Sequence, residues 1–200
     1  MTAKGKTRKK PASNKSRIRP VPVSKMHPAW LKTLERIPGD GLKGQYFPKN
    51  VLGTLMHNKK TVGPFLEYWV GAKLDMGFSV REQELVILRM GYLYCCEYVW
   101  KHHVPVAEEF GVTEKEFAAL KKSSISAVFP RRERALLVLT DEMVEHRTIR
   151  PAVWNRYKDV LSKSEWVDLI GLISQYVLFA LTNNAMQVEL EETLADIPGL

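Results

Sequence analysis

The sequence of 200 residues contains little cysteine, with two residues that are adjacent at Cys95 and Cys96. Two neighbouring thiols cannot build a disulfide framework or a cysteine-rich zinc site, which excludes disulfide-rich secreted folds. No apolar run approaches the roughly 18 to 20 residues that span a bilayer. The N-terminus also lacks the apolar stretch of a signal peptide. We therefore expect a cytoplasmic protein with free thiols and no membrane span.

Acidic residues are absent from the first 20 positions, which carry eight lysines and arginines. The whole chain has 30 basic and 22 acidic residues, so subtracting those eight leaves 22 of each in residues 21–200. A basic segment with almost no apolar residues cannot offset the entropy lost on ordering. We predict a disordered basic arm over 1–20 and a single domain over 21–200. For the arm we favour a solubilising role over contact with nucleic acid.

Signals for β-strands are also missing, because no stretch alternates at period two and no Asn-Gly or Asp-Gly turn joins strand-like runs. Apolar residues recur instead at spacings of three and four, which is typical of helices. Capping-box patterns mark three helix starts, at Ser79, Thr113 and Ser162. Other predicted helices begin near Pro28, Asn50, Thr61, Pro130 and Pro151. The sequence predicts an all-α fold, with an interruption near the cysteines.

Groups capable of chemistry gather just after that interruption. Cys96 and His103 are seven residues apart, which is about two helical turns and puts both on nearly the same face. They can line one pocket with Val99 between them, and Tyr98 adds a phenol nearby. His102 should point elsewhere on the helix, into solvent.

Two polar residues interrupt the long apolar stripe that follows Ser162. Tyr176 and Asn184 would need buried hydrogen bonds there. The pattern leaves open whether they serve the structure or reach the pocket. The remaining histidines show no metal-ligand spacing, so we expect no metal site.

The segments 81–89 and 97–103 resemble the carboxymuconolactone decarboxylase and alkylhydroperoxidase D superfamily. Its thiol-active branch has Glu, eleven residues, Cys, two residues, Cys, three residues and His. This chain has Glu84, Cys96, Val99 and His103 at those positions, so the second cysteine is missing. The chain instead matches a branch with Arg-Glu-x-Glu-Leu-x-Ile-Leu-Arg followed by Glu-Tyr-x-Trp-x-x-His. The resemblance extends over roughly residues 18 to 192.

The resemblance implies an alkylhydroperoxidase D-like helical bundle that associates as trimers or hexamers and uses no metal or organic cofactor. The expected activity is carboxy-lyase or related lyase chemistry on a small carboxylated or lactone-like metabolite. In this interpretation His103 is the general acid and base, Glu84 and Tyr98 orient it, and Arg89 supplies positive charge for a substrate carboxylate. The expected pocket residues are Val99, Trp100, Tyr176 and Asn184.

Two alternatives from other classes stay open. Cys96 could act as the single thiol of a peroxidase or redox sensor, which requires a depressed thiol pKa. The chain could also be a non-catalytic oligomeric binding protein whose basic arm contacts nucleic acid, with binding that falls steeply with salt.

Overall fold

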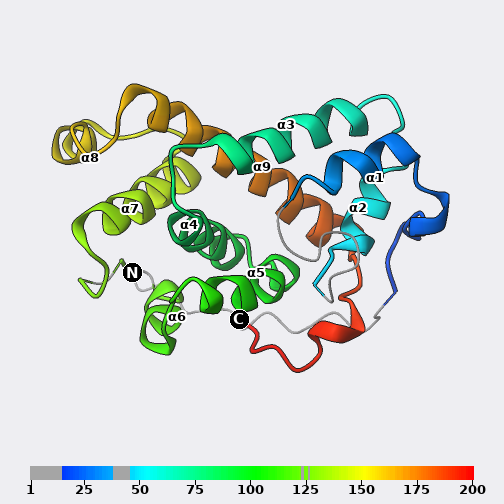
Figure 1. Ribbon diagram of the computed structural model, residues 1–200. Helices are drawn as coiled ribbons and strands as arrows, with labels where there is room; N and C mark the ends of the chain where they lie inside the picture. The colour runs from blue at the N-terminus through cyan, green and yellow to red at the C-terminus, as the bar shows by residue number, and fades with distance from the viewer. Residues whose placement is uncertain (1–14, 38–45, 123, 126) are drawn as a thin grey trace.

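The computed structural model describes residues 15–37, 46–122, 124–125 and 127–200, which form helices joined by short connections (Figure 1). No strand occurs in these residues, and the predicted all-α class is confirmed. The helices are α1 (Pro28–Leu34), α2 (Lys49–Leu55), α3 (Val62–Asp75), α4 (Val80–Leu93), α5 (Glu97–Glu109), α6 (Glu114–Leu120), α7 (Arg131–His146), α8 (Pro151–Tyr157) and α9 (Lys163–Met186).

Each of the three predicted capping boxes starts a helix. Ser79 accepts a hydrogen bond from the main chain of Glu82, whose carboxylate accepts one from the main chain of Ser79. The same reciprocal bonds start α6 at Thr113 and α9 at Ser162. Since these bonds satisfy amides that the first helical turn leaves unpaired, local sequence alone sets these boundaries.

The predicted interruption near the cysteines is confirmed. Cys95 has φ 49°, in the left-handed region, and Cys96 becomes the N-cap of α5. The chain therefore reverses, and α5 packs along α4. Gly91 permits this approach, because a Cβ atom there would lie 3.3 Å from the main-chain nitrogen of Trp100. The reversal brings the end of α5 beside the start of α4.

Helix α4 lies at the centre of the molecule, in contact with α5, α6, α7 and α9 (Figure 1). Every residue from Gln83 to Gly91 is buried. Two apolar clusters form around it, one toward α3 and α9 and one toward α5, α6 and α7. A charged side chain within this stretch is therefore buried and needs a partner.

Helix α9 has 24 residues and is, by length and composition alone, apolar enough to cross a membrane. This corrects the expectation that no apolar segment is long enough to span a bilayer. Polar residues scattered along 163–186 interrupt the apolar run, although the mean hydropathy of the helix is high. The helix packs against α2, α3, α4 and α5. A core helix of a soluble protein passes the same test, so α9 is weak evidence for a membrane.

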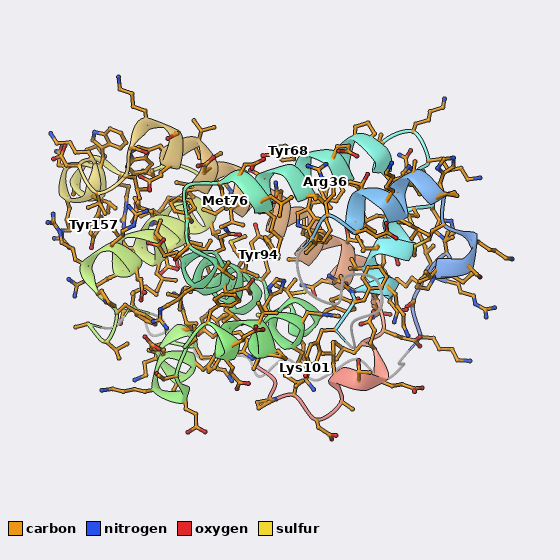
Figure 2. All side chains as sticks on the ribbon, viewed as in Figure 1. Arg36, Tyr68, Met76, Tyr94, Lys101 and Tyr157 are labelled. Carbon is orange, nitrogen blue, oxygen red and sulfur yellow. The ribbon has the colours of Figure 1, made fainter. Side chains whose placement is uncertain are left out.

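Both ends of the described chain pack on the bundle. The main-chain nitrogen of Arg17 donates to the carbonyl of Met186 at 2.8 Å, so the folded part extends into the predicted basic arm. Residues 1–14 of that arm lie outside the described residues. At the other end, Lys101 on α5 donates to the carbonyls of Leu194 and Ala195 (Figure 2).

Candidate functional site

A cavity of about 770 Å³ lies among α3, α4, α5, α9 and residues 46–51. Most of its wall is apolar, including Leu34, Ile37, Phe47, Val51, Trp69, Val99, Val106 and Phe179. The polar groups at its wall are Tyr46, Lys73, Ser79, Gln83, Glu84, Tyr98, His102, His103, Glu109, Tyr176 and Asn183. Size and lining are those of a site for a small, largely apolar molecule.

The reversal at the cysteines joins Glu84 of α4 to His103 of α5. Nδ1 of His103 lies 2.5 Å from Oε2 of Glu84, and the Glu84 side chain is completely buried. An ionised carboxylate only accepts hydrogen bonds, so Nδ1 carries a proton and donates it to Glu84. Glu84 and His103, both predicted as site residues, are thus in direct contact although they are 19 positions apart in the sequence.

Glu84 has a second cationic neighbour. Nζ of Lys73 lies 3.5 Å from Oε1, which makes an ion pair but is long for a hydrogen bond. Burial opposes ionisation of Glu84, but the charge and hydrogen bond of His103, together with Lys73, outweigh it and hold the pKa of the carboxyl below its ordinary value. Glu84 therefore stays ionised next to the imidazole at neutral pH.

Tyr176 of α9 occupies the other side of the His103 ring. Its hydroxyl lies 3.1 Å from Nε2. Burial, and to a smaller degree the charge of Glu84, raise the pKa of Tyr176 well above its ordinary value, so the phenol stays protonated. With Nδ1 donating to Glu84, the hydroxyl donates to Nε2 of the neutral ring. Carboxylate, imidazole and phenol form one hydrogen-bonded chain at the cavity wall.

His102 belongs to a separate buried network, which corrects the expectation that it is solvated. Its Nε2 lies 2.8 Å from Oε2 of Glu191, and its Nδ1 lies 3.1 Å from the carbonyl of Tyr46. Tyr98 donates to Oε1 of Glu191 at 2.8 Å. Burial and the charge of Glu191 raise the pKa of Tyr98 well above its ordinary value. Tyr98 lines the cavity but contacts His102 and Glu191, so Tyr176 takes the position beside His103 that the sequence suggested for Tyr98.

Cys96 does not share the cavity with His103. Its side chain is fully buried in the apolar cluster and is absent from the cavity wall. Burial raises the pKa of the Cys96 thiol to about 11. Cys95 is exposed. At neutral pH the thiol of Cys96 is therefore protonated and enclosed, unlike a reactive cysteine.

Three other predicted pocket residues lie away from the cavity. Arg89 is buried but turned toward α7, where it makes two hydrogen bonds to Asp141, at 2.6 and 2.8 Å. Its third nitrogen, Nη1, donates to the carbonyls of Leu120 and Lys122. Trp100 packs in the second apolar cluster and donates to the carbonyl of Pro198. Asn184 is exposed and donates to the carbonyl of Tyr94. These residues join elements together instead of lining the site.

Two cavity residues that the sequence interpretation missed follow helical spacing. Asn183 lies seven residues after Tyr176, which is closer to the same face than the eight residues of Asn184. Lys73 lies four residues after Trp69 on the apolar stripe of α3 and is a charged interruption of it. Glu191 and Gln83 carried no comparable signal. Within the described ranges, no three His, Cys, Asp or Glu side chains are grouped to hold a metal ion.

Residues 63–141 match the carboxymuconolactone decarboxylase family, a segment that contains Lys73, Glu84 and His103. No curated protein matches the chain. The fold is similar to that of the debrominase Bmp8, with a TM-score of 0.71, 15% identity and coverage of 90% of this chain and 97% of that one.

Two bacterial structures are also similar at low identity. An uncharacterised peroxidase-related protein of Silicibacter sp. TM1040 has a TM-score of 0.64 at 15% identity and covers 74% of this chain and 78% of its own. A protein of unknown function from Agrobacterium tumefaciens, named as an antioxidant defence candidate AhpD, has a TM-score of 0.61 at 16% identity, with coverage of 67% and 92%. The family match and the shared fold confirm the resemblance that the motif predicted.

Proposed function

We propose that this protein belongs to the carboxymuconolactone decarboxylase and alkylhydroperoxidase D-like superfamily and is an enzyme that cleaves a small carboxylated or lactone-like molecule by proton transfer. The observation that carries the proposal is the chain from Glu84 through His103 to Tyr176 at the cavity wall. The Glu84 carboxylate accepts from Nδ1 and fixes the ring, which leaves Nε2 as the nitrogen that can take up and release a proton when His103 acts as general base and acid.

The proposed step balances without an oxidant or reductant. In a decarboxylation, the C–C bond to the carboxylate breaks, carbon dioxide leaves, and the electron pair stays on the remaining carbon. That carbon takes a proton from the imidazolium of His103, which regains a proton from water. Tyr176 holds the ring in place in both states, because a hydroxyl can donate to neutral Nε2 or accept from protonated Nε2.

Turnover of a panel of carboxylated lactones and ring acids in D₂O tests this proposal. We expect release of carbon dioxide or another cleavage product, with deuterium at the cleaved carbon. His103→Gln should lower kcat about 10²- to 10⁴-fold, the usual contribution of a general acid or base. The control is Lys158→Met, an exposed change away from the cavity. A His103→Gln protein with full turnover would contradict the role of His103.

A thiol reaction at Cys96 is the second candidate, favoured by the fold that the chain shares with a peroxidase-related protein. The burial and raised pKa of Cys96 argue against it. Peroxide consumption by reduced wild-type and Cys96→Ala protein, with intact-mass measurement, separates the two candidates. Rapid oxidation confined to Cys96 would favour the thiol reaction, whereas slow and unselective oxidation would remove it.

We further propose that the protein is a homo-oligomer, either a trimer or a hexamer. Support comes from α9, where Val167, Ile170 and Leu181 leave more than half of their surface exposed along one face. Exposed apolar side chains at helical spacing are typical of an interface between subunits. Size-exclusion chromatography with light scattering measures the mass of the particle and therefore the number of subunits. A monomeric mass would contradict the proposal.

A further inference from the structure

Lys73 is a cationic group at the cavity that the proposed chemistry has not yet used. Its Nζ lies 3.5 Å from Oε1 of Glu84, and its side chain keeps 24% of its surface exposed. Within the described part of the chain, Oε1 has no hydrogen-bond partner, so this contact is an ion pair without a close hydrogen bond. The ammonium group can therefore offer its N–H donors to a ligand while its charge still acts on Glu84.

The cavity wall offers a ligand one basic side chain of the lysine or arginine type. Lys73 is the one lysine or arginine among the described residues that line the cavity. The acidic lining residues are Glu84, whose Oε2 contacts His103 and whose Oε1 pairs with Lys73, and Glu109, which is exposed to solvent. His102 already contacts Glu191. An anionic ligand group at this point would share the Lys73 ammonium group with Glu84, because the long contact to Oε1 leaves N–H donors available.

Arg89, the residue first expected to hold a carboxylate, cannot take this role. Its guanidinium group already donates to Asp141 and to two main-chain carbonyls, and the residue is 1% exposed. Lys73 differs because it has one long ionic contact and faces a largely apolar cavity. An ammonium group in apolar surroundings interacts with a carboxylate more strongly than it would in water.

We propose that Lys73 binds the carboxylate of the substrate and that the cavity selects ring-sized, otherwise apolar monoanions. The inference rests on the proposed function, since Lys73 shares Glu84 with His103 and would hold the carboxylate near the imidazole. Lys73 is then a binding residue, whereas His103 moves the proton.

Binding of benzoate and its neutral counterpart benzamide, and of phenylacetate and phenylacetamide, tests this inference by ligand-observed NMR titration. We expect the wild-type protein to bind at least one acid about tenfold or more tightly than its amide, the usual range for one charge-assisted contact. Lys73→Met should remove this preference, and Lys73→Arg should keep most of it. Lys158→Met should bind like the wild type.

Two outcomes would overturn the inference. One is that neither acid binds more tightly than its amide, and the other is that the preference survives in a folded Lys73→Met protein. His103→Gln separates this result from the proposed function, because that variant should lose turnover and keep the carboxylate preference. If His103→Gln retains turnover while Lys73→Met loses the preference, the proton-transfer proposal fails and the binding role of Lys73 stands.

Discussion

The adjacent residues His102 and His103 of α5 each contact a buried glutamate, yet their second ring nitrogens meet different kinds of group. His102 faces acceptors at both nitrogens, the Glu191 carboxylate and the Tyr46 carbonyl, so each nitrogen can form its hydrogen bond only as a donor. His103 faces Glu84 at Nδ1 and a hydroxyl at Nε2, and a hydroxyl can donate or accept. The first arrangement fixes a proton in place, whereas the second lets a proton leave and return.

The contrast assigns different roles to two similar pairs. The pair of His102 and Glu191 holds the C-terminal segment against α5 and the Tyr46 main chain. The pair of His103 and Glu84 connects α5 to α4 at the cavity. A contact between histidine and glutamate is therefore not enough to identify a catalytic group. The group that contacts the other ring nitrogen determines whether the histidine can exchange a proton.

Removal of His102 should give the largest effect on stability. His102→Leu leaves the Glu191 carboxylate buried without its histidine partner, which costs about 3–5 kcal/mol of unfolding free energy. In a domain of this size that corresponds to a fall in Tm of roughly 6–20 °C. Thermal unfolding of His102→Leu, Glu191→Leu and the double variant measures the coupling. Protein that remains folded should turn substrate over, and a fully stable but inactive His102→Leu would contradict the comparison.

The fold was more predictable than the site because helix starts depend on local chemistry. The pattern of Ser79 with Glu82 and the two other capping boxes is complete within four residues. The break at the cysteines was also visible as a lapse in the apolar period. Such signals need no knowledge of distant parts of the chain.

The site depends on contacts between distant residues, which local patterns cannot give. The motif identified Glu84 and His103, but Glu191 is 89 residues from His102 and carried no signal. The resemblance assigned Arg89 to the substrate carboxylate, and Asn184 was considered for the pocket because it is polar on an apolar stripe. The structure satisfies them with Asp141 and the Tyr94 carbonyl instead. Arg89 is buried beside Asp141 whereas Asn184 is exposed, so a polar residue in an apolar segment indicated neither its burial nor its partner.

Tyr176→Phe tests the role of the group beside Nε2 of His103. We expect it to have a smaller effect than the loss of His102. The change removes the hydroxyl from Nε2 of His103 but leaves the contact with Glu84 intact. We expect kcat to fall about tenfold, the equivalent of one hydrogen bond to a group that becomes charged. Tyr98→Phe is the matched control, since it removes a hydroxyl from Glu191 and should leave kcat nearly unchanged. Equal losses in both variants would contradict the assignment of Tyr176 to His103.

The smallest expected effect is on acid unfolding, where the two glutamates should behave alike. Burial opposes ionisation of Glu191 too, but the hydrogen bond and charge of His102 hold its pKa below its ordinary value, as His103 does for Glu84. A depressed pKa stabilises the fold above the ordinary value of 4.5, and this contribution is lost as the pH falls through the folded value.

Glu84→Gln and Glu191→Gln should each therefore lose less Tm than the wild type between pH 6 and 3. We expect the difference to be at least about 2–4 °C, the shift that 1 kcal/mol produces in a domain of this size. Turnover at pH 7 then separates the pairs, because Glu84→Gln should be inactive and folded Glu191→Gln active. An unchanged acid profile in either variant would show that its carboxylate is not held ionised by its histidine.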